Sequence, residues 1–348
     1  MATYRVGVIG CGGISRTHAR GFNALASAEV VAAADINKES VDKFGEEFSV
    51  SARYTDFREM LAKEQPDIVS ICTWPGAHAE ATIAAAENKV KGILCEKPMC
   101  INLGQANAMI EACEKSGTKL AIGHHSRFIA RNTASRKLVA EGAIGQPTLM
   151  IRRVGGGLLN NGSHAVDLMR YLLSDPETEW VIGQVERKTD RYERVIRVED
   201  LCMGLICFVG GARGIIESDM PESGMPGGTF IYGTEGMLNI GGDNLLLQNP
   251  KQAGWQVMDV PPDTNQFAEM IEWIEERSGH RNEAKQTRYA IEILMAIYES
   301  LRIKGLVKMP LETKESPLYL MIDEGALPVE KPGKYDIRLP ESMWNMLK

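Results

Sequence analysis

The first third of the chain alternates short apolar runs with longer amphipathic stretches. The apolar runs have strand length and lie at 5–9, 29–35, 67–73, 92–96 and 119–125. Stretches with helical character lie between them, at about 13–26, 38–48, 78–88 and 103–117. This β-α-β-α alternation predicts a parallel sheet covered by helices on both faces, with right-handed crossovers. Ligands of such sheets bind beyond the carboxyl ends of the strands.

From residue 147 onward the pattern changes to short strands separated by glycine turns. Residues 201–220 predict a hairpin around Gly210-Gly211, and residues 228–248 predict further short strands. Two helices follow, near 265–276 and 286–303. The pattern suits a sheet with one exposed face, and such a face commonly forms a subunit interface.

Composition and charge exclude several classes of protein. The 348 residues are 44% hydrophobic and 24% charged, as in a globular protein of roughly two domains. The net charge of −7 disfavours a broad nucleic-acid surface. The apolar runs are too short for a membrane span, and the N-terminal run lacks the form of a signal peptide. Seven cysteines without a CxxC pair favour reduced core thiols in a cytoplasmic protein, and we expect no metal site.

The first apolar run leads into a glycine motif, GVIGCGGIS. Gly10-x-Gly12-x-x-Ser15 matches the dinucleotide-binding fingerprint: a tight turn, an approach for a pyrophosphate, and close packing of the helix. Asp35 follows about 20 residues later at a strand end, where a carboxylate binds ribose hydroxyls and repels a 2′-phosphate. We therefore expect NAD as the cofactor; Lys38 nearby keeps NADP open as the alternative.

In residues 92–100, GILCEKPMC, an apolar run typical of a buried strand is followed at once by an acid and a base. Glu96 and Lys97 are expected at the carboxyl end of this strand, on the cofactor edge of the sheet. Pro98 restricts Lys97 to extended geometry and permits a cis bond before it. A solvated loop pair is the alternative, but the position at the sheet edge favours a functional role.

Four motifs together resemble one family. GVIGCGGIS, TWPGAHAE, CEKP and GGGLLNNGSHAVDL are similar to the glucose–fructose oxidoreductase, inositol dehydrogenase and rhizopine-catabolism (Gfo/Idh/MocA) family, over about residues 4–310. The resemblance implies an α/β fold: an N-terminal Rossmann domain with a doubly wound parallel sheet, and a C-terminal α+β domain with a large, mostly antiparallel sheet. We place these domains at 1–123 and 124–311. A tail at 312–348 is expected to pack on the core or on a neighbouring subunit.

The resemblance also implies roles for individual residues. Lys97 matches the family's lysine near the reacting hydroxyl, and His164 matches its active-site histidine. Structural roles stay open for His78, at a helix start, and for the Trp74 ring. The predicted cofactor-binding residues are Gly10, Gly12, Gly13, Ile14, Asp35, Ile36, Thr73, Trp74, His78, Glu96 and Lys97.

The second domain is expected to supply the substrate contacts. Asn160 stands where the family's sugar and inositol dehydrogenases commonly carry aspartate, and an amide binds a hydroxyl without taking up a proton. Asn160 or Asn161 is also expected to cap the following helix. The predicted substrate-binding residues are Asn160, Asn161, His125, Arg127 and Arg153. Arg152 and Arg153 either bind an acidic group of a sugar derivative or line the outer face of the sheet.

The implied reaction is NAD-dependent hydride transfer at a secondary alcohol carbon of a sugar, cyclitol or sugar derivative. Either His164 or Lys97 is the base, and the sequence does not separate them. Two alternatives stay open: a redox-neutral NAD-dependent glycosidase or lyase of the same fold, and a non-catalytic NAD-sensing regulator. We expect a homodimer or homotetramer formed through the second sheet, with no nucleic-acid or membrane partner.

Overall fold

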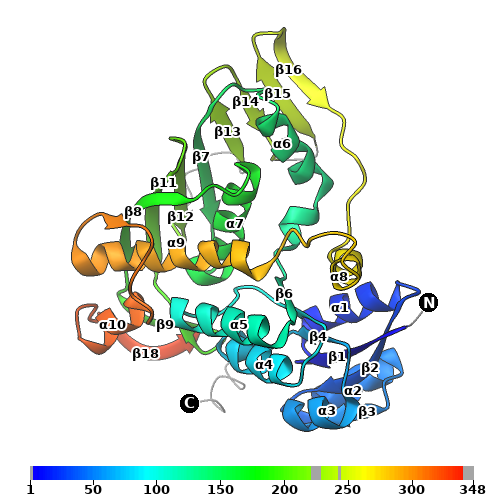
Figure 1. Cartoon of the computed structure of the whole chain (residues 1–348). Coiled ribbons are helices and arrows are strands. Elements are labelled where there is room, and N and C mark those ends of the chain that lie inside the picture. The colour runs from blue at the N-terminus through cyan, green and yellow to red at the C-terminus, as the bar shows by residue number, and fades with distance from the viewer. Residues whose placement is uncertain (1–2, 221–228, 242–243, 340–348) are drawn as a thin grey trace. The chain divides into compact units, whose positions relative to one another are not determined.

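The computed structural model describes residues 3–220, 229–241 and 244–339 (Figure 1). Packing divides the chain into two units, the first comprising residues 1–124 with 265–288, and the second residues 125–264 with 289–348. Residues 265–288, placed by the sequence analysis in the second domain, therefore pack with the first unit. The boundaries of independently folding domains stay predictions.

The first unit is built on a parallel sheet of six strands in the order β3-β2-β1-β4-β5-β6. The order reverses between β1 and β4, which is where open α/β sheets bind ligands. The strands are β1 (Tyr4–Ile9), β2 (Ala28–Ala34), β3 (Ala52–Tyr54), β4 (Ile68–Ile71), β5 (Gly92–Cys95) and β6 (Lys119–Ile122). Five of them were predicted. The edge strand β3 was not, because its three residues are too few to form a pattern.

Helices cover the first sheet and bury their apolar stripes against it. They are α1 (Gly13–Asn23), α2 (Lys38–Phe48), α3 (Phe57–Glu64), α4 (Pro75–Glu87), α5 (Leu103–Ser116) and α8 (Gln266–Ile274). Helix α1 buries Ser15, His18, Ala19 and Phe22, a spacing that places all four on one face. Phe22 packs against Phe267 of α8 with ring centroids 4.9 Å apart, which ties residues 265–288 to this unit.

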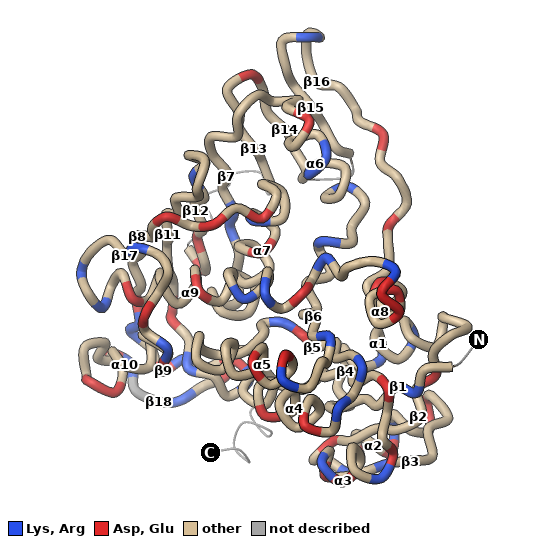
Figure 2. The backbone as a smooth tube through the Cα atoms, viewed as in Figure 1, with Lys and Arg blue, Asp and Glu red and all other residues tan. Residues whose placement is uncertain are grey.

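The solvent side of α2 and α3 carries closely spaced acids and bases (Figure 2). Lys38–Asp42, Lys43–Glu39 and Lys63–Glu59 are ion pairs four residues apart on one helix face. Because these pairs are exposed, each contributes little to stability. They mark the solvent face of the helices rather than a binding site.

The second unit contains a sheet of nine strands in the order β16-β15-β14-β13-β7-β12-β11-β8-β17. Only β7 and β12 pair in parallel, so the predicted, mostly antiparallel sheet is confirmed. The strands are β7 (Pro147–Val154), β8 (Thr178–Glu186), β11 (Leu201–Phe208), β12 (Arg213–Ser218), β13 (Phe230–Gly233), β14 (Met237–Asn239), β15 (Leu245–Asn249), β16 (Gln252–Met258) and β17 (Val307–Lys308). The predicted hairpin joins β11 to β12 through Gly210 and Gly211, whose φ angles are 93° and 96°.

One face of this large sheet is covered by α7 (Ser163–Leu172) and α9 (Ala284–Ile303). A Cβ atom at Gly183 or Gly204 would lie 2.6 Å from side-chain carbons of Ile297 in α9, so these positions admit only glycine. The opposite face carries a row of apolar side chains in register across the strands. They are Ile182, Leu205, Ile215, Ile151 and Phe230, with Val257, which is 68% exposed, on the β16 edge.

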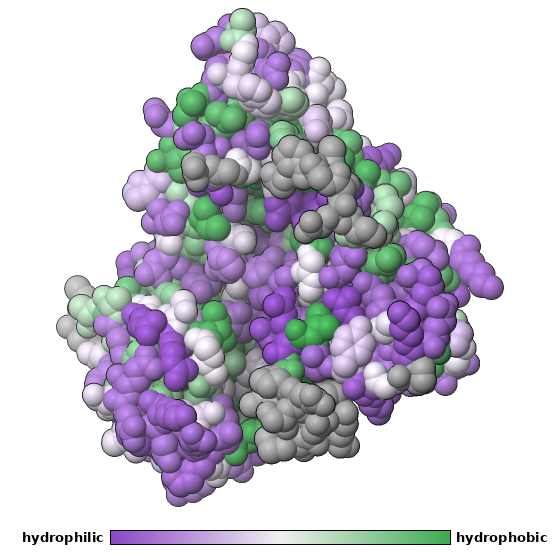
Figure 3. Space-filling view, turned by 180° about the vertical axis from the view of Figure 1, so that it is seen from behind, coloured by the Kyte–Doolittle hydropathy of each residue, from purple (hydrophilic) through white to green (hydrophobic). Residues whose placement is uncertain are grey.

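Seen from the side opposite to Figure 1, hydrophobic residues appear as separate patches among hydrophilic ones (Figure 3). Within the described residues, no helix has both the length and the apolar character needed to cross a membrane. All seven cysteines are buried and free of disulfide bonds, as the sequence predicted.

The second unit contains further short elements. They are η1 (His125–Phe128), α6 (Ala130–Ala140), η2 (Gly157–Gly162), β9 (Thr189–Glu193), β10 (Ile196–Arg197), α10 (Pro317–Asp323) and β18 (Lys331–Asp336). Strand β18 pairs in parallel with β9, so the tail packs on its own chain up to residue 339.

Candidate active site

The glycine turn after β1 has the shape that a dinucleotide phosphate requires. Gly10 has φ +89°, and a Cβ there would lie 2.7 Å from backbone atoms of Cys72 and Thr73, so only glycine fits. Nothing lies within 4 Å of a Cβ built at Gly12 or Gly13. No side chain caps the first turn of α1, and that turn carries no acid. The turn therefore offers space and helix N–H groups to an anion.

Asp35 stands at the end of β2, beside this turn. Its Oδ2 accepts a hydrogen bond from the Cys11 N–H (2.7 Å), and its Oδ1 accepts one from the Asn37 N–H (2.8 Å). These bonds hold the carboxylate in one orientation. Ile36 is 87% exposed and Ile14 is 42% exposed, so two apolar side chains face solvent next to the acid. Together with the glycine turn, these groups fit the adenosine half of NAD.

Glu96, at the end of β5, is held by a histidine that the sequence analysis missed. Its Oε1 lies 2.8 Å from His18 Nε2, and its Oε2 accepts from the Lys97 N–H at 3.2 Å. His18 Nδ1 in turn lies 2.7 Å from Ser70 Oγ. A Cβ at Gly123 would be 2.6 Å from Glu96 Oε1, so a larger residue there would displace the Glu96 carboxylate. The only sequence signal was a polar residue on the buried stripe of α1.

The His18–Glu96 pair is buried, and the pKa shifts of its two groups favour the charged form. Burial by itself lowers the pKa of His18, but Cys72 and the Glu96 carboxylate raise it, to about 10. Burial raises the pKa of Glu96, but the hydrogen bond from His18 and the charges of His18 and Lys97 bring it below its usual value. The two shifts agree in favouring an imidazolium–carboxylate pair near neutral pH.

The Lys97–Pro98 peptide bond is cis. His78 lies in the first turn of α4, with Nδ1 2.9 Å from the Pro98 carbonyl and Nε2 3.0 Å from the Thr73 carbonyl. Both ring nitrogens face backbone oxygens, and burial lowers the His78 pKa. This arrangement favours the structural role for His78: it joins the loop after β4 to the loop that carries Lys97. Trp74 is half-buried at the N-cap of α4.

In the second unit, the predicted substrate residues divide into two groups. His125 in η1 and His164 in α7 lie together, with ring centroids 4.9 Å apart and an interplanar angle of 75°. Asn160 and Asn161 lie in η2, one π-helical turn that leads into α7. Gly162 stands at the N-cap of α7 and no side chain caps that helix, so the prediction that an asparagine caps it was wrong. The π turn directs the asparagine side chains to other partners.

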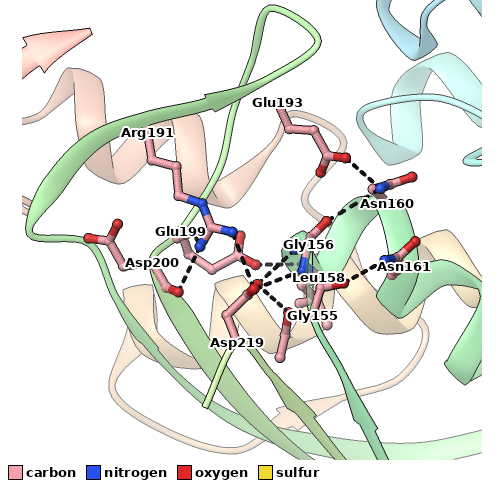
Figure 4. Close-up of polar contacts among 12 residues, drawn as sticks. Gly155, Gly156, Leu158, Asn160, Asn161, Arg191, Glu193, Glu199, Asp200 and Asp219 are labelled. Carbon is pink, nitrogen blue, oxygen red and sulfur yellow. Dashed lines mark hydrogen bonds and ion pairs between the residues drawn. The ribbon is translucent and has the colours of Figure 1, made fainter. Parts of the chain in front are cut away.

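A network of carboxylates holds this turn (Figure 4). Asp219 accepts from the Gly156 and Gly157 N–H groups, both at 2.7 Å, and lies 3.2 Å from Arg191. Glu199, fully buried, accepts from the Leu158 N–H at 2.6 Å and from the Tyr298 hydroxyl at 2.7 Å. These groups come from β9, the residue after β12, the segment before β11 and α9. All are far from residues 155–161 in sequence, so no local motif predicted them.

The two asparagines of η2 have separate partners (Figure 4). Asn160 Nδ2 donates to Glu193 Oε1 at 2.5 Å, and Asn161 Nδ2 donates to the Gly155 carbonyl at 2.5 Å. Asn160 is buried and Asn161 half-buried. The amide that replaces the family's common aspartate is therefore attached to a carboxylate from another strand.

Arg127, also predicted to bind the substrate, has acidic partners of its own. It is buried, and its guanidinium contacts both oxygens of Asp167 at 2.7 and 2.8 Å and Asp175 at 2.8 Å. Burial opposes its charge, but Asp167 and Asp175 raise its pKa above the usual value. The structure favours a structural role for Arg127, which joins η1 to α7.

The two arginines at the end of β7 point to opposite faces of the sheet. Arg153 is on the exposed face and forms an ion pair with Glu217 at 2.5 Å, which favours the outer-face alternative for this predicted substrate residue. Arg152 is in register with Ile216, whose side chain approaches Gly162 of η2, so it lies on the face that carries η2 and α7. Its buried Nε has no hydrogen-bond partner among the described residues, and burial lowers its pKa.

The fold and the glycine cradle define the class: an oxidoreductase with an NAD-binding Rossmann fold. Residues 4–124 match the model of the oxidoreductase family with that fold, and residues 150–239 match the Gfo/Idh/MocA C-terminal domain. The chain belongs to the Gfo/Idh/MocA family, as its motifs predicted.

Several relatives of this chain are named as enzymes of sugars and cyclitols. Myo-inositol 2-dehydrogenase of Thermotoga maritima is 28% identical over 228 residues, covering 62% of this chain and 68% of that protein. The 1,5-anhydro-D-fructose reductase of Ensifer adhaerens is 28% identical over 265 residues, covering 71% and 78%. The aldose-aldose oxidoreductase of Caulobacter crescentus shares the fold, with a TM-score of 0.76, 24% identity and coverage of 88% and 100%.

A second similar structure is the WlbA dehydrogenase of Bordetella pertussis in complex with NADH and UDP-GlcNAcA. It has a TM-score of 0.75 and 21% identity, covering 89% of this chain and all of that one. At this identity the likeness shows the fold alone.

Proposed function

We propose that the protein is an NAD-dependent dehydrogenase that transfers a hydride between a secondary alcohol carbon of a sugar, cyclitol or sugar derivative and the nicotinamide. The observation that carries the proposal is the Glu96–Lys97 loop at the carboxyl edge of the nucleotide-binding sheet, with Glu96 held by His18. A protein that only sensed NAD would need the glycine cradle but not this acid-base loop. The names of the relatives support the substrate class.

NAD⁺, when bound, supplies the hydride acceptor. Gly10, Gly12 and the first turn of α1 would hold the phosphates, and Asp35 and Glu96 the two riboses. Asp35 supports NAD over NADP, because its carboxylate is fixed by the Cys11 and Asn37 N–H groups and would repel a 2′-phosphate. Lys38, the residue that kept NADP open, forms an ion pair with Asp42 at 2.6 Å.

His164 takes the proton of the substrate hydroxyl in this proposal, and Lys97 donates to the same oxygen and stabilises its negative charge. The His125 ring, edge-on to His164, limits the orientations of the base. Asn160 and Asn161 bind other hydroxyls. In the alternative, Lys97 is the base and His164 donates to the oxygen. The pH profiles of kcat in Lys97→Met and His164→Asn distinguish the two assignments.

Arg152 supports a substrate with an acidic group. A guanidinium with a buried nitrogen and no described partner is costly unless an anion accompanies it. A carboxylate or phosphate on the sugar would supply that anion. The similar structure with bound UDP-GlcNAcA shows that this fold accepts an acidic, nucleotide-linked sugar.

The exposed face of the nine-stranded sheet supports the proposed homodimer or homotetramer. Ile182, Ile215, Ile151 and Phe230 form a continuous apolar row across it, and the Arg153–Glu217 pair satisfies its own charges. A second copy of the chain would bury this row. Light scattering with Ile182→Lys and Ile151→Lys checks the proposal, since both changes should lower the molecular mass.

The experiment that tests the function follows NADH absorbance with a panel of free sugars, cyclitols, uronates and nucleotide sugars, and follows glycoside cleavage in parallel. NADH formation that is lost in Lys97→Met and His164→Asn, while NAD binding is retained, supports the dehydrogenase. Cleavage without net NADH overturns it in favour of a redox-neutral glycosidase or lyase. NAD binding with neither reaction, across the whole panel, contradicts it in favour of a sensor.

A further inference from the structure

We propose that Glu193 is a positioning residue for Asn160. In this pair one member must be a carboxylate and the other an amide. The inference rests on the proposed function, in which Asn160 binds a substrate hydroxyl. It adds a residue on β9 and one from the tail to the substrate site.

Glu193 is a buried acid placed against η2. It is 3% exposed, and its Oε1 accepts from Asn160 Nδ2 at 2.5 Å and lies 3.2 Å from Arg338 Nε. A Cβ at Gly157, which has φ +85°, would lie 3.0 Å from Glu193 Oε2. The glycine turn thus makes room for this carboxylate, whose burial would be costly without such partners.

The contacts of the Asn160 amide nitrogen fix the orientation of its side chain. Its Nδ2 donates to Glu193 and, at 3.4 Å, to the Gly156 carbonyl. Both N–H groups are therefore directed at protein oxygens, and the stronger of the two contacts is the one to the Glu193 carboxylate. Glu193 thus fixes the orientation in which the Asn160 side chain meets the substrate.

The same geometry predicts what an aspartate at position 160 would do. An aspartate at 160 would place a second carboxylate at hydrogen-bond distance from Glu193. Two carboxylates so close cannot both ionise, and the pKa of one rises strongly. In this chain the carboxylate of the pair is on β9 and the amide is on η2, so the swapped pair, with aspartate at 160 and glutamine at 193, should restore one carboxylate and one amide.

Arg338 connects the pair to the C-terminal tail. It follows β18, which is parallel to β9, and its guanidinium approaches both Glu193 and Gly156. It supplies the positive charge that balances the buried acid. The tail therefore contributes to the orientation of Asn160, besides packing on the second unit.

The test is a double-mutant cycle with N160D, E193Q and N160D/E193Q in the full chain, measured by kcat/KM as a function of pH. We expect N160D to lose about 100-fold near neutral pH and to gain activity as the pH falls and one carboxyl protonates. E193Q should lose about tenfold, mainly through KM, because a neutral amide oxygen holds Asn160 Nδ2 more weakly than a carboxylate and no longer balances the charge of Arg338. The double variant should lie within about tenfold of the wild type.

Losses that add in the double variant, or an N160D pH profile that matches the wild type, would overturn the proposal. R194Q is the matched control: Arg194 lies in the same β9–β10 turn and makes no hydrogen bond or ion pair to a described residue, so its pH profile should not change. If N160D does not fold, R338Q is the second variant. It removes the charge beside Glu193, so we expect it to fold stably and to raise KM.

Failure of this inference is separable from failure of the proposed function. If no substrate yields NADH, the pH dependence of unfolding still reports on the pair, because the carboxylates in N160D share a proton and those in the double variant do not. An unfolding profile of N160D that equals that of the double variant would overturn the pairing without any activity measurement.

Discussion

The chain contains two glycine turns that each lead into a helix with predicted site residues, and they are held in different ways. The turn at residues 10–13 is shaped by its own glycines, with one bond from Asp35, 24 residues away. The turn at residues 155–157 depends on Asp219, 62 and 63 residues away, and on Glu199, which binds the neighbouring Leu158 N–H. In both, a carboxylate accepts from backbone N–H groups at the turn.

The turn at residues 10–13 is suited to bind a phosphate with its backbone, whereas the turn at residues 155–157 is suited to orient side chains. A pyrophosphate needs space and N–H groups, which glycines and a helix start provide locally. A substrate hydroxyl needs side chains in fixed orientations, and these need support from other strands. Substitutions in the first turn should therefore affect NAD binding, and substitutions around the second should affect the substrate.

The largest effect is expected at Gly10. Gly10→Ala places a methyl group 2.7 Å from backbone atoms at a φ of +89°, so we expect a loss of about 4 kcal/mol in unfolding free energy, together with loss of NAD binding. Gly12→Ala is the matched control, because its Cβ meets nothing within 4 Å and its φ is −75°. It should keep its stability in urea unfolding and weaken NAD binding in calorimetry. Equal stability losses in the two variants would contradict the difference between them.

The second turn should respond to Asp219→Asn. The amide keeps the shape but has one acceptor oxygen for two N–H groups, and it removes the anion beside Arg191. We expect a loss of about 3 kcal/mol in stability and a raised KM for the substrate, with the Kd for NAD unchanged. Asp259→Asn, an exposed acid without a described hydrogen bond, is the control. A change in NAD affinity as large as that in KM would count against the separation of the two turns.

A smaller effect with a defined pH dependence is expected for the His18–Glu96 pair. The folded pKa of His18, about 10, is above its unfolded value of about 6.5, so its contribution is complete below pH ~6.5 and is lost as the pH rises toward 10. Glu96→Gln should cost roughly 2 kcal/mol at pH 6, and this difference should shrink as the pH rises.

Urea unfolding of the wild type and Glu96→Gln at several pH values from 6 to 10 checks this prediction. His280→Gln is the control, since burial lowers the pKa of His280 to about 4 and it titrates below this range. A Glu96→Gln difference that does not change with pH would show that His18 is neutral in the folded protein.

The smallest effect is expected at Arg153. Its ion pair with Glu217 is on the exposed face of the sheet, so Arg153→Ala should change stability by less than about 0.5 kcal/mol and leave KM unchanged. Arg152→Ala is the sharper counterpart and should raise KM for acidic substrates and not for neutral ones. A raised KM in Arg153→Ala would restore the original assignment of Arg153 to the substrate.

Much of the first unit followed from the sequence, because its signals are local. Alternating apolar runs, the glycine spacing and Asp35 at a strand end each lie within a few residues of the feature they predict. The cis bond before Pro98 was also anticipated as an option. His18 was missed because a buried histidine on a helix stripe resembles any core residue until its partner, 78 positions away, is known.

The second unit was predicted only in outline. Its hairpin and antiparallel sheet were expected. Asn160 or Asn161 was expected to cap the helix, whereas a π turn directs their side chains to Glu193 and Gly155. Arg127 was assigned to the substrate, and its buried contacts with Asp167 and Asp175 favour a structural role. In each case a partner distant in sequence decided the orientation of the side chain.

The sequence by itself determined the family, the nucleotide cradle and the identity of the acid-base loop, since these depend on backbone sterics and on residues adjacent in the chain. Only the tertiary structure decided which carboxylate accompanies Asn160, which arginine shares a face with η2, and what holds Glu96. These relations depend on strand register and on pairs brought together from distant segments, and no local pattern encodes a buried hydrogen bond between residues that far apart.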